Sequence, residues 1–272
     1  MLINARLVIF DLDGTLYEGT DHFDYYANHL KNKVAVEKQE DFMTEYEKMK
    51  AGNHLVSIGK VYDVNRDLIL TINPLDLFVT AAYKWNGEKL GVEELRQLYP
   101  GAQQFDFEHL VAIGDGWWLP FACAKHYGVK DCYSSYLATK EYMVSDQFTI
   151  EKLTGLRDYL LELREKTNIV LMTNSDREDV GRLLKELDLD GVFEHVITSA
   201  KKPTYTKGLI EHLIQQYEVK PHEVLSIGDN FINEIAPALS LGTKAMYIQP
   251  HGHNEEVPNL QVIPSITACY QN

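Results

Sequence analysis

Cysteine is scarce in this sequence of 272 residues, and its placement argues against a disulfide framework and against a cysteine metal site. The three cysteines are Cys123, Cys132 and Cys269, an odd number without the close spacing of metal-binding pairs. Disulfides accumulate in oxidising compartments, whereas reduced thiols are typical of the cytoplasm. We therefore expect a cytoplasmic protein.

Long hydrophobic runs and repeats are also missing. No apolar run approaches the roughly 18 residues that a membrane-spanning helix needs, and no internal repeat or low-complexity tract is present. The first predicted strand begins almost at the first residue, which leaves no room for a signal peptide before it. We therefore expect a globular protein with neither a membrane span nor a secretion signal.

Positive charge is in deficit as well. The sequence has 26 basic and 40 acidic residues, which gives a formal net charge of −14. Such a charge repels nucleic-acid phosphates and anionic membrane surfaces, so neither is expected as a partner. A small anionic substrate would need local positive charge from a metal ion, a lysine or backbone amides.

What the sequence does have, near its beginning, is a short apolar run that ends in two closely spaced carboxylates. Residues 8–15 read VIFDLDGT, and the apolar part predicts a buried strand. Because alternate residues of an extended chain point to the same side, Asp11 and Asp13 are expected to face one space. Two such charges repel each other unless a cation joins them or one keeps a proton. Taken alone, the pair would more often be an ordinary acidic loop.

With its Gly-Thr ending, this segment resembles the first motif of the haloacid dehalogenase (HAD) superfamily, most of whose members are phosphatases. The superfamily pattern requires three more elements in order: a strand ending in Thr or Ser, a Lys, and a second acidic strand end. Residues 168–174 (NIVLMTN), 201–203 (KKP) and 224–230 (VLSIGDN) supply them in that order. Four ordered matches are far more specific than any one of them.

The resemblance implies an α/β fold whose core is a Rossmann-like parallel sheet, formed by residues 1–18 and 150–272. The residues themselves support this, because helical apolar spacing alternates with short apolar runs after residue 150. That alternation predicts parallel strands joined by helical crossovers. Ligands of such sheets bind beyond the carboxyl ends of the strands, where the motif residues lie.

Residues 19–149 form an insert of different character, which contains all three tryptophans. Its apolar positions mostly follow helical spacing, as Phe42, Tyr46 and Met49 do. We therefore predict a mainly helical second domain, which resembles the C1-type cap of the superfamily. Caps of this type close over the site, exclude water and contact the leaving group.

The resemblance implies catalytic roles for both carboxylates of the first motif. Asp11 would be the nucleophile that forms an aspartyl-phosphate intermediate. Asp13 would be the acid/base that protonates the leaving alcohol and later takes a proton from the attacking water. Mg²⁺ would be the cofactor, held by Asp11, the backbone carbonyl of Asp13 and Asp229, since it prefers hard oxygen ligands.

The resemblance also implies phosphate-binding roles for Thr173, Asn174 and Lys202, of which Thr173 and Lys202 would be catalytic too. Thr173 would bind a phosphoryl oxygen, although it could instead cap the helix expected to begin near Ser175. Lys202 would neutralise charge on the nucleophile and the phosphoryl group. Lys201 is the alternative, and Lys202 is preferred because it directly precedes a proline of fixed backbone angle.

Two residues near the last motif are expected to support the site. The superfamily often has an Asp five residues after the position of Asp229, where this sequence has Glu234. Glutamate is longer by one methylene, so it would reach the metal through water or pair with Lys202. Asn230 is assigned to the same supporting group.

Two further patterns imitate functional motifs. Residues 111–116 (VAIGDG) look like another strand ending in Gly-Asp, but they precede the Thr and Lys elements. We expect Asp115 to lie in a structural turn. His251 and His253 suggest a metal site, yet they have no carboxylate partner at helical spacing, so a solvated loop is expected.

The leading hypothesis is an Mg²⁺-dependent phosphatase acting on a small phosphorylated metabolite, either a sugar phosphate or a nucleotide. One alternative is a phosphomutase of the same fold. The other is a HAD-like binding protein without catalytic activity. Dehalogenation is disfavoured by Asp13, because dehalogenases of the superfamily lack the second aspartate and do not need the metal.

Overall fold

The computed structural model describes residues 5–249 and 257–271. His251 and His253, which we expected in a solvated loop, lie outside these described residues. Among the residues that are described, no helix is both long enough and apolar enough to cross a membrane.

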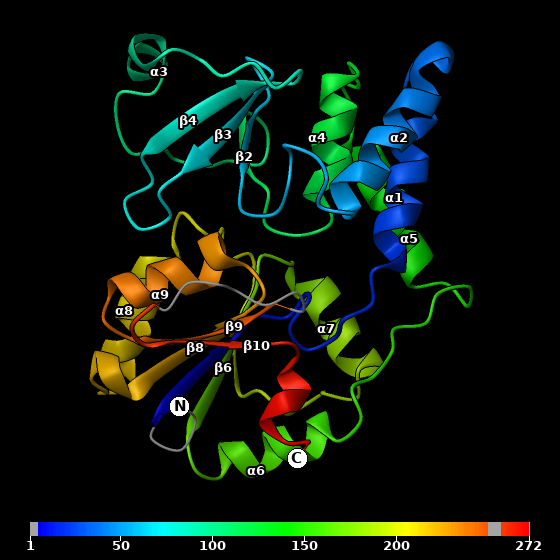
Figure 1. Ribbon diagram of the computed structural model, residues 1–272. Helices are drawn as coiled ribbons and strands as arrows, with labels where there is room; N and C mark the ends of the chain where they lie inside the picture. The colour runs from blue at the N-terminus through cyan, green and yellow to red at the C-terminus, as the bar shows by residue number, and fades with distance from the viewer. Residues whose placement is uncertain (1–4, 250–256, 272) are drawn as a thin grey trace. The chain divides into compact units, whose positions relative to one another are not determined.

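The chain folds into two compact units (Figure 1). The core unit combines Met1–Gly19 with Ile150–Asn272, and the insert unit is Thr20–Thr149. Each unit has its own sheet and its own hydrophobic core.

The core unit is built on a six-stranded parallel sheet with the strand order β10-β9-β8-β1-β6-β7. Every residue of the central strand β1 is buried, which fits a parallel sheet covered on both faces. The predicted α/β fold with a parallel sheet is therefore confirmed. The strands are β1 (Leu7–Phe10), β6 (Asn168–Met172), β7 (His195–Ile197), β8 (Val224–Gly228), β9 (Lys244–Ile248) and β10 (Leu260–Ile263).

Helices alternate with these strands along the chain and bury their apolar faces on the sheet. Ile210, Leu213 and Ala238 share one buried cluster with Leu7 and Ile9 of β1. The helices are α6 (Leu156–Arg164), α7 (Arg177–Glu186), α8 (Thr206–Gln216) and α9 (Ala236–Ser240), with 3₁₀ helices at Pro221–Glu223 and Ile266–Cys269 and a π-helix at Phe231–Ile235.

The register of the central strands brings their carboxyl ends to one edge of the sheet. Phe10, the last residue of β1, pairs with Leu171 of β6 and with Ile227 of β8. The residues that follow in these three segments therefore emerge together, at the edge where sheets of this kind bind ligands. Asp11 is the first residue beyond β1.

The insert unit contains a four-stranded antiparallel sheet that we did not predict, so the expectation of a mainly helical insert was incomplete. Its strand order is β4-β3-β2-β5. Residues 61–72 (VYDVNRDLILTI) carry the missed signal, two apolar segments around an Asn/Asp turn, which is typical of a hairpin. The strands are β2 (Val61–Asp63), β3 (Leu68–Ile72), β4 (Val79–Lys84) and β5 (Leu110–Ala112).

The helices of the insert unit bury the residues that helical spacing selected. Phe42, Tyr46 and Met49 of α2 are all buried in one cluster, against which Trp85 and Trp117 pack. The helices are α1 (Asp21–Lys31), α2 (Gln39–Lys50), α3 (Val92–Leu98), α4 (Trp118–His126) and α5 (Tyr133–Met143), with a 3₁₀ helix at Val36–Lys38.

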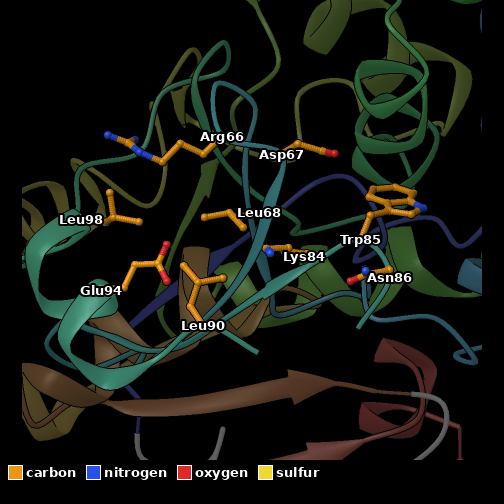
Figure 2. Close-up of a pocket in the computed structure, with 9 residues that line it drawn as sticks. All are labelled: Arg66, Asp67, Leu68, Lys84, Trp85, Asn86, Leu90, Glu94 and Leu98. Atoms are coloured by element: carbon orange, nitrogen blue, oxygen red, sulfur yellow. The ribbon is translucent and has the colours of Figure 1, made fainter. Parts of the chain in front are cut away.

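A pocket of about 540 Å³ lies within the insert unit, beside the four-stranded sheet and α3 (Figure 2). Leucines give it apolar walls, and its lining includes two basic residues, Arg66 and Lys84, and two acidic residues, Asp67 and Glu94. None of the residues predicted for catalysis lines this pocket. The predicted chemistry has to be sought in the core unit.

Replacing Phe10 by alanine should destabilise the core unit by about 3–5 kcal/mol, because it opens a cavity beside the central strand. Phe10 is fully buried and packs edge-on against Phe193. The measurement is the midpoint of urea unfolding, followed by circular dichroism. Val36→Ala is the control, since Val36 is 82% exposed in the insert unit. Equal midpoints for the two variants would contradict this packing.

Candidate active site

Three predicted site residues emerge where neighbouring strands of the core sheet end. Asp11 follows β1, Thr173 follows β6, and Asp229 follows β8. The Asp11 amide continues the ladder by donating to the carbonyl of Ile227 (2.9 Å), and the Thr173 amide donates to the carbonyl of Ile197 (2.9 Å). The backbone of the sheet thus fixes the places from which these side chains start.

Three carboxylates gather at this edge. One oxygen from each of Asp11, Asp229 and Glu234 lies within 4.8 Å of the others. Asp11 and Glu234 are buried, while Asp229 is partly exposed. A hard divalent cation such as Mg²⁺ prefers oxygen ligands of this type, so the donor set fits the predicted metal.

Two glycines leave the space that this cluster occupies. A Cβ atom on Gly14 would lie 2.1 Å from Oδ2 of Asp229, and the φ of Gly14 is +72°. A Cβ atom on Gly228 would lie 2.8 Å from Cγ of Glu234. The first glycine therefore meets two requirements, a left-handed backbone and the close approach of a carboxylate.

Lys202 joins two of the three carboxylates. Its Nζ atom lies 2.6 Å from Oδ1 of Asp11 and 2.6 Å from Oε1 of Glu234, and the lysine is only 4% exposed. Lys201, the alternative for the same role, is exposed. The structure therefore places Lys202 against Asp11, the predicted nucleophile, and it places Glu234 in direct contact with that lysine.

The ionisation of this cluster follows from its burial. Burial raises the pKa of Asp11 above its usual value, and the nearby Lys202 ammonium offsets only part of that effect. Burial likewise raises the pKa of Glu234 to about 8, against the opposing effect of Lys202. Burial alone would lower the pKa of Lys202, but Asp11 and Glu234 raise it. The site therefore has more buried acid than one lysine neutralises, which favours a further cation.

Asn174 holds the segment that carries Lys202. Its Oδ1 atom accepts a hydrogen bond from the Lys202 amide (2.7 Å), and its Nδ2 atom donates to the Lys202 carbonyl (3.2 Å). This two-point contact links the loop after β6 to the loop after β7. We predicted a phosphate-binding role for Asn174, and the four motifs do not indicate its contact with the Lys202 backbone.

Asn230 and a π-helix place the carboxylate of Glu234. Oδ1 of Asn230 accepts hydrogen bonds from the amides of Ile232 and Asn233, which caps the π-helix Phe231–Ile235. The backbone N–H of Asn230 in turn donates a hydrogen bond to Oε2 of Glu234 (3.0 Å). Wide turns of this kind often occur at functional sites, and here the turn directs Glu234 toward Lys202.

Asp13 lies in a different environment, where hydroxyl groups surround it. The Tyr17 hydroxyl donates to Oδ1 of Asp13 (2.5 Å), while the hydroxyls of Ser175 (3.1 Å) and Thr173 (3.4 Å) donate to Oδ2. The Asp13 side chain is not part of the acidic cluster described above. The contacts of Tyr17 and Ser175 were missed at the sequence level, because nothing in the four motifs indicates them.

Thr173 does not cap helix α7, which was the alternative to its phosphate-binding role. Asp176 is the N-cap, and its side chain accepts a hydrogen bond from the Asp179 amide (3.0 Å). Thr173 accepts instead from the Ser175 amide (3.1 Å), within the turn that leads into the helix. The Thr173 hydroxyl therefore remains close to the Asp13 carboxylate and is not part of the helix cap.

The second Gly-Asp pattern is a turn in the insert unit. Oδ1 of Asp115 accepts a hydrogen bond from the Trp117 amide (2.9 Å), between β5 and α4. This matches the structural role expected for Asp115.

Residues 5–242 match the haloacid dehalogenase-like hydrolase family. The chain belongs to this family. The family resemblance drawn from the four motifs is thereby confirmed, and the coarse assignment as a hydrolase with it. None of the curated proteins matches the sequence significantly.

Solved structures support the fold. YfnB from Bacillus subtilis, whose structure is bound to magnesium, matches with a TM-score of 0.54 and 13% identity over 98% of this chain and 97% of its own. A haloacid dehalogenase-like family hydrolase from Xanthomonas campestris gives 0.51 and 12% over 97% and 88%. A dehalogenase with an intermediate complex gives 0.51 and 15% over 98% and 96%. At these identities, the likeness concerns the fold alone.

Replacing Gly14 by alanine should abolish the stabilisation that Mg²⁺ is predicted to give the protein, because the new methyl group displaces the Asp229 carboxylate. The measurement is the melting temperature with and without MgCl₂, since a ligand that binds the folded state raises it. Gly52→Ala is a matched control, with the same φ of +72° but no atom within 4 Å of the added Cβ.

Both substitutions carry the strain of a left-handed alanine, roughly 1–2 kcal/mol. Only Gly14→Ala adds the clash with Asp229. A Mg²⁺-induced shift that is equal in the two variants would remove Asp229 from the proposed metal site.

Proposed function

We propose that this HAD-like hydrolase cleaves phosphate monoesters, with Asp11 as the nucleophile and Asp13 as the general acid/base. The observation that carries the proposal is the different surroundings of these two carboxylates. Asp11 contacts the ammonium of Lys202, whereas both oxygens of Asp13 accept hydrogen bonds from hydroxyls. Two carboxylates in unlike environments are suited to two roles.

In the first half of the proposed reaction, an oxygen of Asp11 attacks the phosphorus atom of the bound ester. The bond between phosphorus and the leaving oxygen breaks, and that oxygen takes a proton from Asp13. Lys202 lies 2.6 Å from Asp11 and would balance the negative charge on the phosphoryl group as it is transferred. The products of this half are the free alcohol and an acyl phosphate on Asp11.

In the second half, the Asp13 carboxylate takes a proton from a water molecule as the water oxygen attacks phosphorus. The bond between phosphorus and Asp11 breaks, which releases inorganic phosphate and restores the Asp11 carboxylate. Asp13 holds its proton again, ready for the next ester. In both halves, Thr173 would turn its hydroxyl proton from Asp13 to a phosphoryl oxygen, giving up its 3.4 Å contact with the Asp13 carboxylate.

The proposed cofactor is Mg²⁺, which would supply positive charge that screens the phosphate from the nucleophile. Asp11 and Asp229 would hold it together with the backbone carbonyl of Asp13. Both oxygens of Glu234 already have partners, Lys202 and the Asn230 amide, so Glu234 would act through the lysine. The fit of the acidic cluster to a hard cation supports this assignment, and the magnesium bound to YfnB agrees with it.

The proposed substrate is a small phosphorylated metabolite, such as a sugar phosphate or a nucleotide. A net charge of −14 disfavours nucleic acid and anionic membranes as partners. All three cysteines are free, which supports the proposal of a cytoplasmic protein. Asp13 and its hydroxyl partners argue against dehalogenation, which would leave an acid/base at this position without a leaving alcohol to protonate.

Asp11→Asn should lower the release of phosphate from p-nitrophenyl phosphate on the order of 10⁴-fold or more, because the amide is not a nucleophile. The assay is run with and without Mg²⁺, and wild-type activity should require the metal. Asp158→Asn is the control, since Asp158 is an exposed residue of α6 in the same unit. Turnover by Asp11→Asn at the rate of the control would overturn the proposal.

Lys202→Met should lower the same activity on the order of 10²- to 10³-fold, the usual effect of removing one preorganised charge. It should also lower the melting temperature, because Asp11 and Glu234 lose a buried partner. Lys201→Met removes an exposed charge one residue away and should leave both quantities near their wild-type values. Equal activities of the two variants would show that Lys202 does not balance charge during the reaction.

A further inference from the structure

The carboxylate of Asp13 is anchored through both of its oxygens. Tyr17 holds Oδ1 at 2.5 Å, and Ser175 holds Oδ2 at 3.1 Å, with Thr173 at 3.4 Å from the same atom. The last torsion of an aspartate side chain is broad, so the orientation of its carboxylate has to be fixed by neighbours. Donors on opposite oxygens supply that restraint.

The backbone after Asp13 brings Tyr17 back beside it. The Leu16 amide donates to the Leu12 carbonyl (2.9 Å), which closes a single turn, and Asp13 and Tyr17 then pair as an isolated parallel bridge. The Tyr17 side chain is only 1% exposed. Its hydroxyl is therefore fixed by the packing of its own ring.

Ser175 is fixed independently, from the loop after β6. Its carbonyl accepts a hydrogen bond from the Ser199 amide (2.9 Å), and its amide donates to Oγ1 of Thr173 (3.1 Å). Tyr17 and Ser175 thus reach Asp13 from two segments far apart in the sequence. A hydroxyl both donates and accepts, so either group stays bonded when Asp13 gains or loses a proton.

We propose that Tyr17 is a positioning residue which, with Ser175, aims the Asp13 carboxyl at the leaving oxygen of the substrate. This inference rests on the proposed phosphatase function and extends it to residues outside the four motifs. A small displacement of a catalytic group from its productive position lowers the reaction rate without abolishing the reaction. The loss should fall on the step in which the leaving group needs a proton.

Two substrates separate that step from the rest. p-Nitrophenolate leaves without a proton, whereas the alkoxide of an aliphatic ester needs one. The quantity kcat/KM covers the steps up to departure of the alcohol, so it excludes the later hydrolysis of the acyl phosphate. The comparison uses p-nitrophenyl phosphate and the aliphatic monoester that the wild-type protein hydrolyses best among sugar phosphates and nucleoside monophosphates.

Tyr17→Phe should lower kcat/KM for the aliphatic ester about 10- to 100-fold, while kcat/KM for p-nitrophenyl phosphate stays near the wild-type value. Tyr46→Phe is the matched control, because Tyr46 is also 1% exposed and its hydroxyl donates to the carboxylate of Asp24 (2.8 Å) in the insert unit. The control should lower neither value selectively. Ser175→Ala should repeat the selective loss, and it carries the test if Tyr17→Phe fails to fold.

Equal losses on both substrates, or no loss on either, would overturn the role of Tyr17 while leaving the phosphatase proposal intact. A wild-type protein that releases phosphate from none of these esters would instead refute the proposed function, and this inference with it. Asp13→Asn is the internal reference. It should also lower kcat/KM more for the aliphatic ester than for p-nitrophenyl phosphate, and by a larger factor than Tyr17→Phe does.

Discussion

The contact of the buried Lys202 ammonium with Asp11 and Glu234 is the interaction on which the rest of the site depends. Charges so far from water are costly unless each finds partners, and removing one leaves the others uncompensated. The lysine, only 4% exposed, contacts both carboxylates at 2.6 Å. Three separate segments must therefore meet at one point: the end of β1, the loop after β7, and the π-helix after β8.

Several neighbouring residues hold these three segments in place around Lys202. Asn174 ties the backbone of Lys202 to the loop after β6, and Asn230 caps the turn that carries Glu234. Gly14 leaves room for the carboxylate of Asp229. Asn174 and Asn230 have short side chains with few rotatable bonds, and Gly14 has none. Their contacts therefore fix the positions of Lys202 and Glu234 at little cost in side-chain entropy.

A second set of contacts separates Asp13 from this charged cluster. Only Leu12 lies between these two aspartates in the sequence, yet Asp11 contacts the Lys202 ammonium and Asp13 contacts hydroxyls. That division supports the two roles that we propose, with Asp11 as the nucleophile and Asp13 as the acid/base. The parallel sheet makes it possible, because each strand end delivers a different loop to the same edge.

The sequence by itself determined the parallel sheet, the family and the order of the strand ends, because apolar runs, their spacing and the four motifs are local properties. It did not reveal the whole antiparallel sheet of the insert, because β2 and β5 have three residues each and pair across a long stretch of sequence. Only the tertiary structure decided between Lys201 and Lys202, paired Glu234 with the lysine, and brought Ser175 to Asp13. These contacts depend on which side chains are buried and on hydrogen bonds between segments far apart in the chain. Local sequence patterns contain neither kind of information.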